Sequence, residues 1–170
     1  MKFGIVMFPS KKLQDVANSY RKRYDPNYSL ISPHITLKYP FKSDEMNIKS
    51  ITKYLSNAAS EIQPFSLNVL KASSFQPVHN TIYLKVEANE PLVQLHKLLH
   101  SGLLTSEPEY AFVPLITICQ KLSNDEHSDV FGQVSMQNFR YEETVDRFHL
   151  LYQLENGAWT VYETFLLGKK

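Results

Sequence analysis

One short segment of the chain combines a base with a hydroxyl donor. In PHITL, at residues 33–37, strand-forming residues follow a proline, and His34 and Thr36 stand at alternate positions. Side chains two residues apart on a β-strand share one face, so the two should project from one surface. An imidazole exchanges a proton near neutral pH, and a threonine hydroxyl can donate a hydrogen bond to a phosphoryl oxygen. The pair therefore predicts phosphate chemistry.

A second segment, PLITI at residues 114–118, repeats this pattern incompletely. Thr117 corresponds to Thr36, but Leu115 stands where a second histidine would complete the symmetry. We interpret Thr36 and Thr117 as ligands for one phosphate and His34 as a proton donor or acceptor. In the alternative interpretation these residues have only structural roles: the threonines are ordinary β-branched strand residues, and the ring of His34 is hydrogen-bonded to a backbone group.

The tetrapeptide HITL at residues 34–37 resembles the His-x-Thr-x motif that occurs twice in the two-histidine (2H) phosphoesterase superfamily, which contains RNA 2′-5′ ligases and cyclic phosphodiesterases. The whole chain, from KFGIV at 2–6 through EHSD at 126–129 to DRFHL at 146–150, resembles the bacterial YjcG-type subfamily of phosphoesterases. The resemblance implies an α+β fold of two pseudo-symmetric lobes. Each lobe would be an antiparallel sheet with outer helices, and the motif strands would face one another across a central cleft.

The resemblance also implies a mechanism without a metal, a cofactor or a covalent intermediate. Two histidines flank a phosphodiester, and one deprotonates a water or ribose hydroxyl while the other protonates the leaving oxygen. We therefore expect a phosphoesterase acting on a 2′,3′-cyclic phosphate or a 2′-5′ linkage of a nucleotide or RNA end, impaired because Leu115 replaces the second histidine. The alternative is a non-catalytic module that binds a nucleotide or RNA end in the same cleft, and a third interpretation is an interaction protein without a ligand.

Other residues suited to chemistry fit the pattern less well. A substitute acid for the missing histidine is hard to find, because His127 falls on a predicted helix and His149 on a later strand. His96 and His100 stand four residues apart on a predicted helix, but the sequence offers no third metal ligand, so no metal site is predicted. Cys119 lacks an evident base and is predicted to be a buried small residue. Aromatic residues beside the motifs could stack on a base, although core positions are commoner for them: Tyr39, Phe41, Tyr110 and Phe112.

Strands and helices alternate around the two motifs, an order that suggests an ancient duplication. The first predicted helix carries basic residues, interpreted as a solvated face in preference to an electropositive rim for substrate: Lys11, Lys12, Arg21, Lys22 and Arg23. The predicted strands cover residues 3–8, 33–40, 65–69, 81–86, 114–118, 148–154 and 159–167, the last two joined at Asn156-Gly157. Two predicted helices cover residues 10–24 and 48–62. A third starts at Asn89, with Gly102 as a candidate end, and a fourth starts at Ser123, which forms a capping box with Glu126.

The composition limits the classes of partner. The 170 residues, 43% hydrophobic and 21% charged, predict one globular domain over residues 1–170. Eighteen basic and seventeen acidic residues give a net charge of +1, which argues against binding long duplex nucleic acid but is compatible with a small phosphorylated substrate. A single cysteine excludes an internal disulfide, and neither a signal peptide nor a membrane span is evident, so a cytoplasmic location is predicted.

Overall fold

The computed structural model describes residues 1–106 and 111–169, whose strands form two four-stranded antiparallel sheets. The strand order is β2-β1-β7-β8 in the first sheet and β5-β4-β3-β6 in the second. The motif strands β2 and β5 each lie at an edge of their own sheet, and those two edges approach one another. The predicted α+β fold of two antiparallel lobes is confirmed. The strands are β1 (Lys2–Met7), β2 (Ile35–Lys42), β3 (Phe65–Ser74), β4 (Ile82–Val86), β5 (Leu115–Cys119), β6 (Tyr141–Val145), β7 (Arg147–Gln153) and β8 (Trp159–Leu166).

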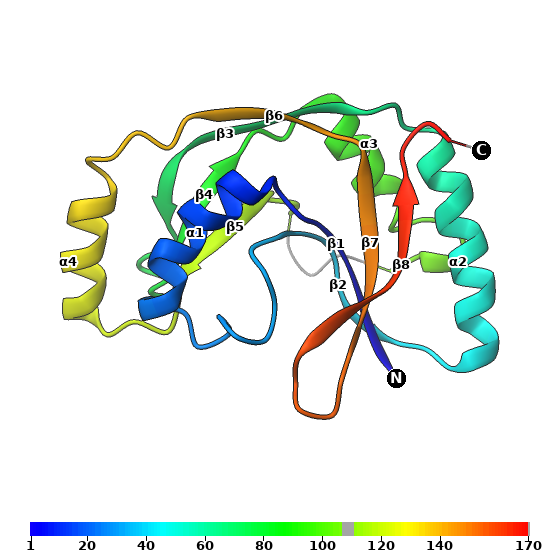
Figure 1. Ribbon diagram of the computed structural model, residues 1–170, viewed down its shortest axis with the longest axis horizontal. Helices are drawn as coiled ribbons and strands as arrows, with labels where there is room; N and C mark the ends of the chain where they lie inside the picture. Colours follow the sequence, from blue (N-terminus) through cyan, green and yellow to red (C-terminus); the bar gives the residue numbers. More distant parts are fainter. Residues whose placement is uncertain (107–110, 170) are drawn as a thin grey trace.

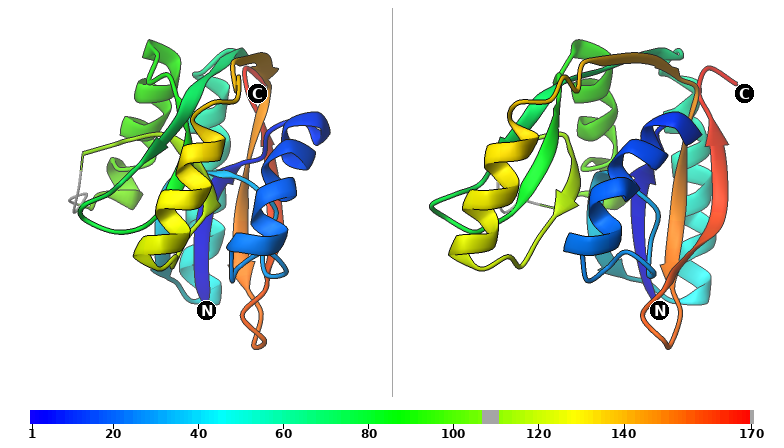
Figure 2. Two further views of the ribbon diagram at one scale, coloured as in Figure 1. Left: turned by 90° about the vertical axis from the view of Figure 1, so that its left-hand side faces the viewer. Right: turned by 60° about the vertical axis from the view of Figure 1, so that its left-hand side comes forward.

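The helices lie outside the sheets, and one of them crosses between the lobes. Helix α1 lies between β1 and β2 of the first sheet in sequence, yet it packs against β5 of the second sheet (Figure 1). Helix α2 packs against β8 at the opposite end of the molecule, as the views of Figure 2 also show. The crossing brings the end of α1 close to both motif strands. The helices are α1 (Lys11–Tyr24), α2 (Glu45–Ser60), α3 (Glu90–Leu98) and α4 (Asn124–Val134), with a 3₁₀ turn η1 (Gly102–Leu104) after α3.

Local signals explain where these helices begin. The Ser10 hydroxyl accepts a hydrogen bond from the Leu13 amide at 3.3 Å, which satisfies one of the free donors at the start of α1. At α4 the predicted capping box is present, since Ser123 and Glu126 each accept a hydrogen bond from the other's backbone amide. Among the described residues, no helix combines the length and the apolar character needed to cross a membrane.

The sequence missed one strand and misjudged some boundaries. Strand β6 was not predicted, and Gly102 opens η1 rather than ending α3, which stops at Leu98. Strand β2 continues past Pro40 to Lys42 instead of closing at the proline. A proline is tolerated there because β2 is an edge strand and its register against β1 shifts twice along this stretch.

The two motif strands send alternate side chains into the core. Ile35 and Leu37 of β2 and Ile116 and Ile118 of β5 are buried in one contiguous cluster that draws residues from both sheets. The side chains between them are therefore turned the other way. Burial of the isoleucines and leucine thus sets the direction in which the motif residues point.

Candidate functional site

A pocket of about 260 Å³ lies between the two motif strands. His34 and Thr36 line it from one side, and Leu115 and Thr117 line it from the other. All four are partly exposed, as side chains directed toward a ligand must be. The structure therefore brings together the four residues that the sequence singled out. The remaining lining residues are Arg21, Asp25, Asn27, Ile31, Tyr39, Val113 and Gln120.

An irregularity in β2 places an aromatic residue at the same pocket. Thr36 pairs with Val6 of β1, and Lys38 pairs with the neighbouring Ile5, so two steps along β2 match one step along β1. Such a bulge reverses the alternation of side chains beyond it. Lys38 is consequently buried and bonded to the carbonyl of Leu104 at 3.0 Å, outside the pocket lining. Tyr39 lines the pocket instead, with 74% of its surface exposed.

The backbone fixes which nitrogen of His34 is available. The Nδ1 atom lies 2.8 Å from the carbonyl oxygen of Ser32. A carbonyl only accepts hydrogen bonds, so Nδ1 carries the proton and Nε2 keeps its lone pair in the neutral ring. Desolvation lowers the pKa of His34 below its usual value, and the Ser32 hydrogen bond acts against it. The neutral imidazole, with Nε2 as a base, is therefore the prevailing form near pH 7.

A buried ion pair lies beside the motif residues, where the sequence predicted a solvated helix face. The Nε atom of Arg21 is 3.2 Å from the carboxylate of Asp25, and both side chains are 2% exposed. The interpretation of Arg21 as part of an exposed basic face is therefore wrong. Arg21 follows Leu13 and Ala17 at four-residue spacing, on the stripe of α1 that the helix buries.

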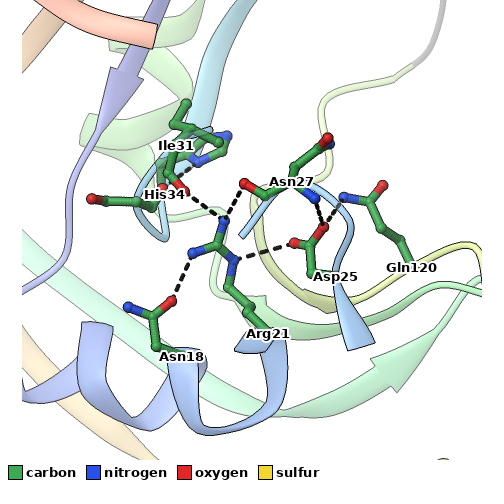
Figure 3. Close-up of polar contacts among 8 residues, drawn as sticks. Asn18, Arg21, Asp25, Asn27, Ile31, His34 and Gln120 are labelled. Carbon is green, nitrogen blue, oxygen red and sulfur yellow. Dashed lines mark hydrogen bonds and ion pairs between the residues drawn. The ribbon is translucent and has the colours of Figure 1, made fainter. Parts of the chain in front are cut away.

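The guanidinium of Arg21 is the centre of a hydrogen-bond network (Figure 3). It donates to the Asn18 side chain at 2.7 Å and to the Ile31 carbonyl at 2.6 Å. Asp25 in turn accepts a 2.8 Å hydrogen bond from the side chain of Gln120, which follows β5. Sequence reasoning missed this network, although an arginine on the buried stripe with an aspartate four residues later was a usable signal.

The other candidate residues lie away from this pocket. His127 is buried against Phe131, with Nε2 2.6 Å from the Ser74 hydroxyl, and His149 lies 2.9 Å from the Thr164 hydroxyl. Neither residue lines the pocket, so neither is placed to replace the missing histidine. Cys119 is buried as predicted, and burial raises the pKa of its thiol to about 12.

The histidine pair on α3 forms an aromatic stack. The ring centroids of His96 and His100 are 4.1 Å apart, and Phe112 stacks on His96 at 4.0 Å. Burial, followed by the neighbouring His100 and Lys38, lowers the pKa of His96 to about 4. Within the described part of the chain, no three His, Cys, Asp or Glu side chains are grouped so as to hold a metal ion. Tyr110, another aromatic candidate, lies outside the described residues.

Comparison with known proteins shows the family of the chain. Residues 8–157 match the family model described as the 2'-5' RNA ligase superfamily. The chain belongs to this superfamily. A protein of Geobacillus sp. strain WCH70 named "Putative phosphoesterase" is 62% identical over 170 residues, covering 100% of this chain and 98% of its own. A Bacillus licheniformis protein carrying the same designation is 60% identical over 168 residues, with 99% of each chain covered.

Solved structures support the fold of this superfamily member. TT0787 of Thermus thermophilus superposes with a TM-score of 0.75 at 18% identity, covering 100% of both chains. E. coli LigT complexed with 3'-AMP superposes with a TM-score of 0.70 at 17% identity, covering 99% of this chain and 98% of LigT. At such identities the likeness shows the shared architecture alone.

Proposed function

We propose that residues 1–170 act as one bilobal phosphoesterase unit that opens a 2′,3′-cyclic phosphate or cleaves a 2′-5′ linkage in a nucleotide or RNA end. His34 is the proton acceptor or donor, and Thr36 and Thr117 bind the phosphate. The observation that carries the proposal is the shared pocket, which is lined by His34, just before β2, by Thr36 of β2, and by Leu115 and Thr117 of β5. Family membership supports phosphoesterase chemistry, and the LigT complexes with 3'-AMP, NADP+, ATP and phosphate support a nucleotide ligand.

In the proposed reaction His34 takes a proton from water through Nε2. The resulting hydroxide attacks phosphorus, and the hydroxyl groups of Thr36 and Thr117 donate hydrogen bonds to the phosphoryl oxygens as charge builds on them. The departing ribose oxygen then needs a proton. A leucine at position 115 cannot supply one, so solvent has to. Because a positioned acid contributes about 10²- to 10⁴-fold, turnover is expected to be slow by that factor.

The proposal is tested by comparing the wild-type chain with His34→Ala, using 2′,3′-cyclic AMP as the substrate. The wild-type chain should release a monophosphate slowly, and His34→Ala should abolish that release while leaving the fold intact. Product formation followed by chromatography or ³¹P NMR gives the rate. Equal rates for the two proteins would exclude His34 as the catalytic group.

A second candidate function is a binding module that uses the same pocket without turnover. Leu115 favours it specifically, because this residue removes one of the two proton-transfer groups while both threonines remain. Calorimetric binding of 2′,3′-cyclic AMP without any hydrolysis, lost in Thr36→Val, would favour the module. Absence of both binding and hydrolysis would favour an interaction protein without a ligand.

A further inference from the structure

The segment that delivers His34 to the pocket lacks regular structure. Residues 25–34 connect α1 to β2 without a helix or a strand ladder, so turn hydrogen bonds and contacts from outside the segment fix its path. The Arg21 guanidinium does so from α1. Its Nη2 atom donates to the Ile31 carbonyl at 2.6 Å and to the Asn27 carbonyl at 3.5 Å. The first of these contacts is three residues before His34.

Most N–H donors of the Arg21 guanidinium already have acceptors within the protein. A guanidinium has five N–H donors. Nε donates to Asp25, Nη1 donates to Asn18, and the two hydrogens of Nη2 are directed to carbonyl groups of the connecting segment. One donor remains on Nη1, so the paired donors of a bidentate phosphate clamp are committed within the protein (Figure 3). Arg21 therefore supports the wall of the pocket through hydrogen bonds within the protein.

Asp25 extends the same network to the second motif. Its Oδ1 atom accepts from the Gln120 side chain at 2.8 Å and from the Asn27 amide at 2.9 Å. The backbone N–H of Gln120 also donates to the carbonyl of Tyr24, the last residue of α1, at 3.0 Å. Since Gln120 follows Thr117 by three residues, a single ion pair contacts the segments that carry both motifs.

We infer that Arg21 is a positioning residue: its hydrogen bond to the Ile31 carbonyl holds His34 with Nδ1 on the Ser32 carbonyl and Nε2 available for chemistry, and its ion pair with Asp25 links this loop to the segment that follows Thr117. The inference rests on the proposed function only in naming His34 as the group whose geometry matters. Arg21 acts through the Ile31 carbonyl on the loop that contains Ser32, so its loss frees the loop rather than removing a contact to substrate.

The charges of the pair support this assignment. Among the described residues that line the pocket, Arg21, Asp25 and His34 are those that carry or gain charge near neutral pH. Arg21 lowers the pKa of His34 and Asp25 raises it, after the larger effects of desolvation and the Ser32 hydrogen bond. The two charges of the ion pair therefore act on the pKa of His34 in opposite directions.

The test measures the His34 ring directly, without substrate. In ¹⁵N-labelled protein, two-bond ¹H–¹⁵N correlations report which ring nitrogen is protonated, and a pH titration gives the pKa. The spectrum of His34→Ala assigns the signals. Arg21→Lys keeps a positive charge beside Asp25 but loses the fork that spans the Asn18 side chain and the Ile31 carbonyl. Lys22→Gln, an exposed neighbour on α1, is the matched control.

We expect wild-type His34 and the Lys22→Gln control to show protonation at Nδ1 alone. In Arg21→Lys the ring should exchange between tautomers, and its pKa should rise toward the ordinary value as the loop loosens and admits water. An unchanged tautomer and pKa in folded Arg21→Lys would overturn the inference. Because no turnover is measured, absence of phosphoesterase activity would refute the proposed function without affecting this result.

A second variant distinguishes a loss of His34 positioning from a general disturbance of the structure around the ion pair. Asp25→Asn keeps the shape of the side chain but leaves the charge of Arg21 without its neutralising partner. The Nδ1 tautomer should persist and the pKa of His34 should fall further, opposite in sign to the change in Arg21→Lys. If Arg21→Lys does not fold, this variant decides alone, because it keeps the Arg21 hydrogen bond to the Ile31 carbonyl, and tautomer exchange of His34 in folded Asp25→Asn contradicts the inference.

Discussion

The two motif strands occupy equivalent positions in their sheets but carry different functional side chains. Strands β2 and β5 each form an edge of an antiparallel sheet, bury alternate residues around the motif in the common core and direct two side chains each to one pocket. Strand β2 is preceded by His34 and contains Thr36, whereas β5 presents Leu115 and Thr117. Backbone geometry and hydrogen-bond donors are thus retained on both sides, and a titratable group is present on one. Under the proposed function, the two strands separate the groups that bind a phosphate from the groups that transfer protons during its hydrolysis.

The largest expected effect comes from restoring the symmetry. Leu115→His supplies the proton donor that β5 lacks, so 2′,3′-cyclic phosphodiesterase activity should rise by about 10²- to 10⁴-fold. Initial rates of monophosphate release measure the change. Leu115→Asn introduces polarity without a group that titrates near neutrality, and it should leave the rate low. An inactive Leu115→His with native structure would show that position 115 is not equivalent to a second catalytic histidine.

Equivalent threonines should contribute equally to ligand binding. Thr36→Val and Thr117→Val each remove one hydroxyl, and each should weaken binding of 2′,3′-cyclic AMP by about 10- to 100-fold, the usual worth of a hydrogen bond to a charged group. Isothermal titration calorimetry gives the affinities, with the exposed Thr144→Val of β6 as the control. If Thr117→Val bound as tightly as wild type, β5 would have lost its phosphate contact together with its histidine.

A pocket with one histidine should show one protonation linked to anion binding. Protonated His34 attracts an anion, and its pKa in the free protein is lowered by desolvation. The affinity for sulfate should therefore rise as the pH falls from about 8 to about 5, by at most about tenfold per pH unit. His34→Ala should abolish this dependence. A steeper slope would indicate a second titrating group, and the measurement is calorimetric.

The smallest effect should be on stability. Leu115 is partly exposed in the pocket and is not among the buried core residues, so Leu115→His should change the free energy of unfolding by less than about 1 kcal/mol. Ile116→Ala, next to it but fully buried, should cost about 2 to 5 kcal/mol. Urea unfolding followed by circular dichroism compares them. Similar losses for the two variants would mean that position 115 also supports the core.

Much of the fold was accessible from patterns that depend on neighbouring residues. The stripes of α1 and α2, the capping box at Ser123 and the final hairpin follow from local periodicity and turn chemistry. Strand β6 escaped detection because Glu142 and Glu143 interrupt its apolar pattern. Charged residues are tolerated there because β6 is an edge strand, and edge position is a property of the assembled sheet.

The sequence by itself determined the chemical types at the site and the face on which they stand. The period of two along each strand places His34 with Thr36 and Leu115 with Thr117, because alternation is built into the extended backbone. The tertiary structure alone decided that α1 packs across onto β5, that the bulge in β2 places Tyr39 at the pocket, and that Asp25 bonds to Gln120 beyond β5. These features depend on contacts between segments far apart in the chain, which no local periodicity encodes.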